Sequence, residues 1–238
     1  MSSSQQDSDA VVHQRFIRQR DLLDRKRVEQ LHVTQIGVGA IGSCTALSLA
    51  KLGISRFTLF DPQDVGVENL GNQLFRNDDL GKPKVEAVSA RLFAEGVISE
   101  VNPIKAMFEG QELPVGPIIL GVDSLEKRRK LWRGLPRVEG QLLIDARMGA
   151  EVAHIYAIDL GNPADRQRYV KSLQGEAHRA SCTARGTVYT ALGIGAFVTA
   201  HLKRWIMGQP TSFGWLYDFV NATAMPIDEN GVPVGITG

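Results

Sequence analysis

Cysteine is scarce in this chain, which has only Cys44 and Cys182 among its 238 residues. Two cysteines cannot build a disulfide framework or a pair of C-x-x-C zinc motifs. The five histidines are scattered without the spacing of metal ligands. The sequence therefore predicts no zinc, and packing alone must hold its C-terminal half together.

Long apolar runs and an excess of charge are also lacking. The most apolar stretch, residues 188–202, is too short and too rich in Gly, Ala and Thr to span a bilayer. The polar first ten residues lack the apolar core of a signal peptide. A formal net charge of +1 gives no electrostatic reason to expect nucleic acid or an acidic membrane as a partner. We therefore expect a cytoplasmic protein with no membrane or nucleic-acid partner and a disordered tail over residues 1–10.

The composition that is present, 43% hydrophobic and 22% charged, supports a sizeable core and suits one domain over residues 11–238. Residues 12–31 predict an amphipathic arm of one or two helices, too polar for the central core. Strands then alternate with helices, residues 161–180 resemble an irregular loop, and closing strands follow at 213–220 and 224–227. This order predicts an α/β fold: a Rossmann-like, mainly parallel sheet with flanking helices, an N-terminal helical arm and C-terminal antiparallel strands.

A glycine-rich turn joins the first expected strand to the first expected helix of the sheet. Gly37 permits a tight turn, Gly39 lets the backbone approach a phosphate, and Gly42 lets helix and strand pack closely. Asp61 ends the next strand and can accept hydrogen bonds from ribose hydroxyls. The helix N-terminus offers free N–H groups to an anion. The pattern predicts a nucleotide site, and the alternative is a tight strand–helix turn without a ligand.

Three acids follow expected strands: Asp61, Asp123 and Asp145. Ligands collect at the carboxyl edge of such sheets, so we expect these acids along that edge, although each could instead cap a helix. A run of basic residues follows Asp123, and we expect it to be a solvated helix face; its members are Lys127, Arg128, Arg129, Lys130 and Arg133.

From about Arg15 to Asp228 the chain resembles the ubiquitin-activating-enzyme-like adenylyltransferases of the ThiF, MoeB and HesA type. The motifs occur in the family's order: Arg15–Gln19 for R-x-x-R-Q, the glycine turn with Asp61, Asn69–Gln73 for N-L-x-R-Q, Gly81–Lys84 for G-x-x-K, Asp123 after the fourth strand, and Ser181–Cys182 before a Gly-rich helix.

The resemblance implies that a C-terminal carboxylate attacks the α-phosphate of ATP, giving an acyl adenylate and pyrophosphate. It implies that Lys84 neutralises phosphate charge in the transition state and that Asp123 holds Mg²⁺ together with phosphate oxygens. Asp61 would hold the ribose, and Asn69 and Gln73 would add polar contacts to the nucleotide.

The resemblance also implies a homodimer in which Arg18 reaches across the interface to the phosphates, because the guanidinium fork binds two oxygens. The partner would be a ubiquitin-like protein, a sulfur-carrier protein or a peptide. The sequence leaves the carboxylate open, and a modified tRNA base is a further alternative.

One departure from the family concerns Asn72, which stands where the family has a phosphate-binding Arg. Since Asn carries no charge, Arg76, Lys82 or Arg18 must compensate, or ATP turnover is weaker. Arg76 is the nearest candidate by sequence, and we expect it to be one of the nucleotide-binding residues.

The two cysteines receive different interpretations. Cys182 could accept the acyl group from the adenylate, with a nearby arginine lowering the pKa of its thiol, or it could be an inert residue before a helix. Cys44 lies inside the first helix of the sheet and is expected in the core.

Two further functions remain open. One is a binding or scaffold subunit that has lost catalysis, which Asn72 favours. The other is a nicotinamide-dependent oxidoreductase, which would share the glycines and Asp61 but would leave Arg18, Lys84 and Asp123 unexplained.

Overall fold

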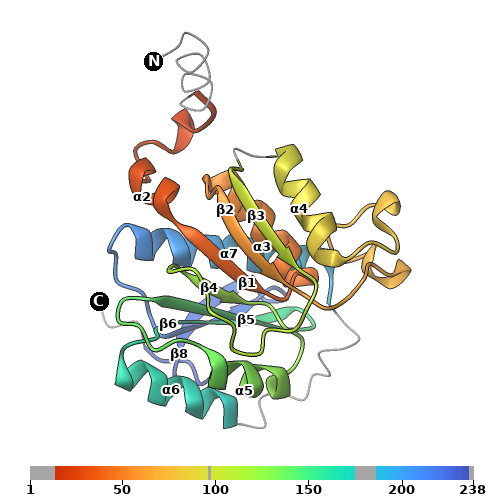
Figure 1. Cartoon of the computed structure of the whole chain (residues 1–238). Coiled ribbons are helices and arrows are strands. Elements are labelled where there is room, and N and C mark those ends of the chain that lie inside the picture. The colour runs from red at the N-terminus through yellow and green to blue at the C-terminus, as the bar shows by residue number, and fades with distance from the viewer. Residues whose placement is uncertain (1–13, 96–97, 175–185, 236–238) are drawn as a thin grey trace.

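The computed structural model describes residues 14–95, 98–174 and 186–235, and an eight-stranded sheet runs through it (Figure 1). The strands lie in the order β3-β2-β1-β4-β5-β6-β7-β8. Their bounds are β1 His32–Ile36, β2 Arg56–Phe60, β3 Glu100–Ile104, β4 Ile118–Leu120, β5 Leu142–Gly149, β6 Val152–Asp159, β7 Gly214–Asp218 and β8 Thr223–Ile227.

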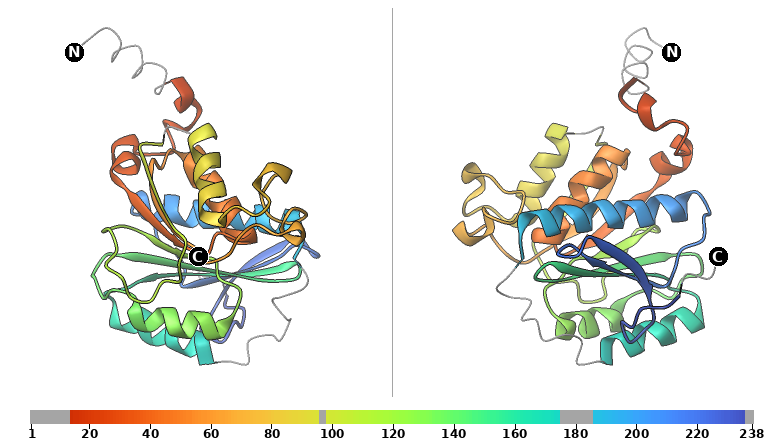
Figure 2. Two further views of the ribbon diagram at one scale, coloured as in Figure 1. Left: turned by 45° about the vertical axis from the view of Figure 1, so that its right-hand side comes forward. Right: turned by 180° about the vertical axis from the view of Figure 1, so that it is seen from behind.

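The sheet is parallel from β3 to β5 and antiparallel from β5 to β8. Helices cover both faces, with α3, α4 and α7 on one and α5 and α6 on the other (Figures 1 and 2). Their bounds are α3 Ala40–Leu52, α4 Lys84–Glu95, α5 Leu125–Gly134, α6 Pro163–Gln174 and α7 Val188–Ile206. The predicted fold class is confirmed, including its C-terminal antiparallel strands.

Small residues let α3 lie close to α7. A Cβ added to Gly195 of α7 would come within 2.9 Å of the backbone carbon of Cys44 in α3. Thr199 donates to Ser48 Oγ at 2.9 Å across the same contact. Cys44 is buried as expected, and burial raises the pKa of its thiol to about 11. This residue therefore packs in the core and does not act as a nucleophile.

The N-terminal arm forms two short helical segments, η1 (Ile17–Gln19) and α2 (Arg25–Gln30). Asp24 caps α2 by accepting from the Arg27 amide. Arg27 also donates to the carbonyl of Ile206 at 2.9 Å, which fastens the arm to the end of α7. The prediction that the arm is too polar for the core is wrong at Val28, which is fully buried within the main core.

Residues 161–180 were expected to be an irregular loop, and the structure corrects this. Residues 163–174 form α6, which buries Tyr169, Ser172 and Leu173 against the sheet. Asn162 accepts from the Ala164 amide at 2.9 Å, and Pro163 opens the helix. An Asn–Pro pair is a typical start of a helix, whereas the polar composition of the segment is typical of a loop.

Other expectations fall outside the described residues, namely the disordered tail at 1–10 and the Ser181–Cys182 motif. Over the part of the chain that is described, no helix has both the length and the apolarity needed to cross a membrane.

We predict that His201 makes stability pH-dependent. Its Nε2 lies 3.2 Å from the Tyr217 hydroxyl, while Nδ1 is buried without a hydrogen-bond partner among the described residues. Burial, with a smaller contribution from Arg204, lowers the pKa of His201 to about 4. The unfolded chain takes up this proton near pH 6.5, so folding stability should fall as the pH drops from about 6.5 to 4, by up to ~1.4 kcal/mol per pH unit. His201→Phe should flatten this part of a stability–pH profile measured by urea unfolding. Equal profiles for variant and parent would contradict the prediction.

Candidate active site

A cleft of about 1180 Å³ opens at the carboxyl edge of the parallel strands and continues over the β5–β6 hairpin. Parallel strands with alternating crossovers leave such a crevice where the strand order reverses, here between β1 and β4. The structure brings most of the predicted site residues to it: Gly37, Gly39, Asp61, Asn69, Asn72, Gln73, Lys84 and Asp123.

The glycines of the turn have different roles. Gly37 has φ +90°, and a Cβ there would lie 2.8 Å from the backbone of Gly121. A Cβ on Gly42 would lie 2.1 Å from the Gly37 carbonyl oxygen, so Gly42 packs helix against turn without lining the cleft. At Gly39 the nearest atom to an added Cβ is Gln73 Oε1 at 3.6 Å, which leaves the backbone open to the cleft.

Asp61 is held in place by backbone amides. Its Oδ2 accepts from the Val38 amide in the glycine turn at 2.9 Å, and its Oδ1 accepts from the Gln63 amide at 2.9 Å. The carboxylate is buried at the end of β2 and lines the cleft. Each oxygen keeps acceptor capacity for a hydroxyl of a bound ligand.

Lys84 is a buried cation at the start of α4. Only 4% of the residue is exposed, and its Nζ donates to Gln63 Oε1 at 2.9 Å. None of the ion pairs found among the described residues involves Lys84, so a neutral amide and not a carboxylate holds the ammonium group. Its charge therefore remains available to an anion in the cleft.

The loop between β2 and α4 contributes amide side chains. Asn69 accepts from the Gly66 amide at 2.9 Å and so stabilises the short helix η2 (Val67–Asn69). Asn72 donates to the carbonyl of Gly186 at 3.3 Å. Asn72 Oδ1 and Gln73 Oε1 are buried and have no hydrogen-bond partner within the described residues. Buried acceptors of this kind suit the hydroxyl or amino groups of a ligand.

Asp123 follows β4 and pairs with Lys127 one helical turn later, at 2.7 Å. Both side chains are about half exposed, so this pair is weak enough to open. In the described parts of the chain no three His, Cys, Asp or Glu side chains form a metal-binding group. The donor chemistry nevertheless fits Mg²⁺, which is commonly bound by one or two carboxylates plus phosphates and water.

The structure corrects the placement of Asp145. This residue lies inside β5, opposite Leu120 of β4, and is fully buried instead of ending a strand at the cleft. It accepts from Arg128 Nε and Arg147 Nε, each at 2.7 Å, and from the Tyr169 hydroxyl at 3.0 Å. Burial opposes ionisation, but the two guanidinium groups outweigh it and lower the pKa of Asp145.

The basic run on α5 is also corrected in part. Lys127 and Lys130 pair with acids one turn earlier and lie on the surface as expected. Arg128, however, is 2% exposed and reaches Asp145 and the carbonyl of Ala146. Sequence reasoning missed Arg128 and Arg147, both of which line the cleft. The one available signal was the position of Asp145 directly after the apolar residues 142–144, since a buried acid requires a buried cation.

Besides Gly42, two further predicted residues do not line the cleft of their own chain. Arg18 is exposed on η1, whose Gln19 donates to the Lys51 carbonyl at the C-terminal end of α3. Arg76 is exposed at the start of the short helix η3 (Asn77–Asp79). Cys182 lies outside the described residues.

Fold and cleft together define an α/β protein with a nucleotide-type glycine turn at the carboxyl edge of its sheet. The model of the ThiF family matches residues 13–225, and the chain belongs to this family.

Relatives match over shorter segments. A tRNA threonylcarbamoyladenosine dehydratase of Haemophilus influenzae is 39% identical over 67 residues, which are 28% of this chain and 26% of that protein. Ubiquitin-like modifier-activating enzyme 5 of Arabidopsis thaliana is 29% identical over 104 residues, 43% of this chain and 23% of that protein. The matches thus span about a quarter of each of these curated relatives.

Solved structures share the fold over most of the chain. Escherichia coli MccB in complex with ATP has a TM-score of 0.65 and 18% identity, covering 89% of this chain and 68% of MccB. PaaA has a TM-score of 0.69 and 16% identity, covering 96% of this chain and 74% of PaaA.

We predict that Gly42→Ala destabilises the protein, because its methyl group would meet the Gly37 carbonyl oxygen at 2.1 Å. Overpacking of this kind costs about 1–3 kcal/mol. Gly71→Ala is a matched control, since nothing lies within 4 Å of a Cβ there. Urea unfolding should separate the two variants, and equal midpoints would show that helix α3 can shift to make room.

Proposed function

We propose that this protein is an ATP-dependent adenylyltransferase that activates the C-terminal carboxylate of a ubiquitin-like protein, a sulfur-carrier protein or a peptide. The observation that carries the proposal is the meeting of Lys84, Asp61 and Asp123 around the open backbone of Gly39 in one cleft. The relatives named as ubiquitin-like modifier-activating enzymes and the MccB structures with ATP and with MccA support it.

In the proposed reaction a carboxylate oxygen attacks the α-phosphorus of ATP, and the bond to the β-phosphate oxygen breaks to release pyrophosphate. Asp61 would hold the ribose while the glycine turn receives the phosphates. The buried ammonium group of Lys84 would stabilise charge on the crowded α-phosphate in the transition state. Asp123 would release Lys127 and hold Mg²⁺, which neutralises phosphate charge when bound.

We predict that Lys84→Ala lowers substrate-dependent exchange of labelled pyrophosphate into ATP by about 10²-fold or more, because it removes a transition-state cation. Lys130→Ala is the control, since Lys130 is exposed and pairs with Glu126 on α5. Thermal unfolding of each variant should establish that it is folded.

Full exchange activity in a folded Lys84→Ala protein would reject the role of this lysine. A parent protein that binds no ATP would favour the scaffold function. Stabilisation by NAD and not by ATP with Mg²⁺ would favour the oxidoreductase.

The position of the arm supports a homodimer with a shared site. The contact between Gln19 and the Lys51 carbonyl puts Arg18 near the C-terminal end of α3, whereas the glycine turn lies at its N-terminal end. A helix of 13 residues is roughly 20 Å long, so Arg18 is too far from the cleft of its own chain to act there. We therefore propose that Arg18 acts in the cleft of a second copy.

Mixing Arg18→Ala protein with Lys84→Ala protein should restore part of the exchange activity that each variant lacks. One site in a mixed dimer then combines Lys84 from one subunit with Arg18 from the other. Arg20→Ala in place of Arg18→Ala is the matched control and should need no complementation. A parent protein that is monomeric at micromolar concentration by light scattering would contradict the proposal.

A further inference from the structure

The cluster formed by Arg128, Asp145 and Arg147 carries more positive than negative charge. Two guanidinium groups share one carboxylate, with Nε–Oδ distances of 2.7 Å on each side. The side chains of Arg128, Arg147 and Asp145 are 3%, 11% and 0% exposed. Two positive charges against one negative leave a buried net charge of +1.

Two nearby acids pair with other cations, and a third, Asp228, accepts from the backbone amides of Asn230 and Val232. Asp123 pairs with Lys127, and Glu229 pairs with Arg168 and Lys171. Among the ion pairs of the described residues, Asp145 is the sole carboxylate that contacts the cluster. An uncompensated buried charge is costly, so the cluster favours an anion beside it.

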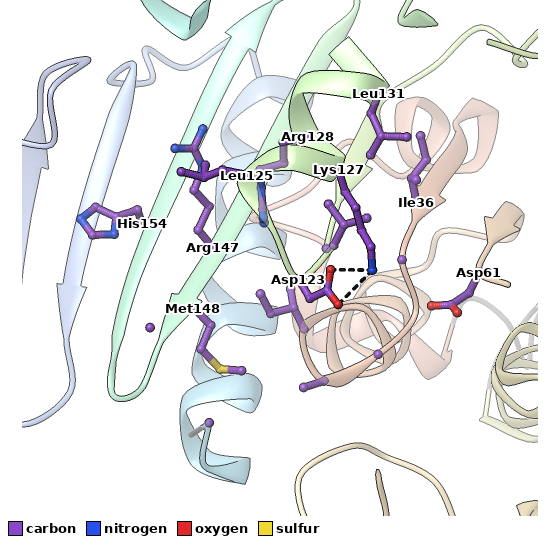
Figure 3. Close-up of a pocket in the computed structure, with 18 of the residues that line it drawn as sticks. Ile36, Asp61, Asp123, Leu125, Lys127, Arg128, Leu131, Arg147, Met148 and His154 are labelled. Atoms are coloured by element: carbon purple, nitrogen blue, oxygen red, sulfur yellow. Dashed lines mark hydrogen bonds and ion pairs between the residues drawn. The ribbon is translucent and has the colours of Figure 1, made fainter. Parts of the chain in front are cut away.

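The cleft is where such an anion can reach the cluster, since Arg128 and Arg147 both line it. In Figure 3, Asp123 lies between Asp61 on one side and Arg128 and Arg147 on the other. A ligand with its ribose at Asp61 would therefore share the cleft with the cluster.

Arg128 is the member with a donor to spare. Its Nε and Nη2 donate to Asp145 and to the Ala146 carbonyl, and Nη1 has no acceptor in the described part of the chain. Arg147 uses all three nitrogens, for Asp145 and for the carbonyl and hydroxyl oxygens of Ser172, and it stacks on Tyr156 at 4.3 Å. Arg128 can thus contact a ligand, while Arg147 and Asp145 position it.

Asn72 lines the same cleft and carries no charge. Asn72 contacts Gly186, which packs against Met148 on the side of the sheet covered by α3 and α7. Arg128 approaches from the opposite side, the one covered by α5 and α6. Asn72 and the cluster therefore line the same cleft from opposite sides of the sheet.

We propose that Arg128, positioned by Asp145 and Arg147, binds the β- and γ-phosphates of ATP. This inference rests on the proposed function for the identity of the nucleotide. Arg76, which the sequence suggested as a phosphate-binding residue, does not line the cleft.

The test is the affinity of Arg128→Met for ATP with Mg²⁺ and for AMP, measured by calorimetry on the full chain. Loss of a charge-assisted hydrogen bond should weaken ATP binding about tenfold or more. AMP binding should stay within about twofold of the parent, because AMP lacks the two phosphates that Arg128 contacts. Arg133→Met is the control, as this arginine is exposed on the same helix and lies outside the cleft.

The variant leaves Asp145 paired with Arg147, so the remaining pair is electrically balanced. Should Arg128→Met nevertheless fail to fold, Arg128→Lys provides the same comparison, because one ammonium group cannot replace the guanidinium fork toward both Asp145 and a phosphate. Unchanged ATP affinity, or an equal loss for ATP and AMP, would overturn the inference. Pyrophosphate exchange tests the proposed function separately, so a parent that binds ATP through Arg128 without exchange would reject that function alone.

Discussion

The backbone contact between Gly42 and the Gly37 carbonyl is the constraint on which the rest of the cleft depends. It allows α3 to begin directly at the carboxyl edge of β1, with the Gly39 backbone facing outward. Gly195 lets α7 pack closely against the backbone of α3 on the side away from the turn. Helix α3 is thus fixed between the sheet and α7, and the amide of Val38 is in turn fixed to Asp61.

The charged groups in the cleft are of two kinds: buried side chains with fixed positions and half-exposed side chains that can move. Lys84 and Arg128 are buried, so their positions are set before any ligand arrives. Asp123 and Lys127 are half exposed and can exchange partners at little cost. Fixed cations beside an adaptable carboxylate suit a reaction in which two anions must meet and one must leave.

Much of this arrangement could be predicted from local patterns. The glycine turn, Asp61 and Lys84 lie in short motifs whose spacing already implies their geometry. The roles of Asp145 and Arg128 could not be predicted, because they depend on contacts between residues 17 positions apart on different elements. The same holds for α6 and for Val28. Both lie in charged segments that predict surface positions, yet a few of their apolar side chains pack into the core. Patterns along the chain do not reveal which polar residues find a buried partner.

The charge imbalance at Asp145 also restricts the order in which Asp145 and its two arginines can be substituted during evolution. Loss of either arginine leaves a neutral pair, whereas loss of the carboxylate leaves two guanidinium groups side by side without a counterion. Substitution is thus tolerated in one order and opposed in the other. In descendants of this chain one of the two arginines can change first without leaving an unpaired buried charge, whereas Asp145 and the remaining arginine can then change only together.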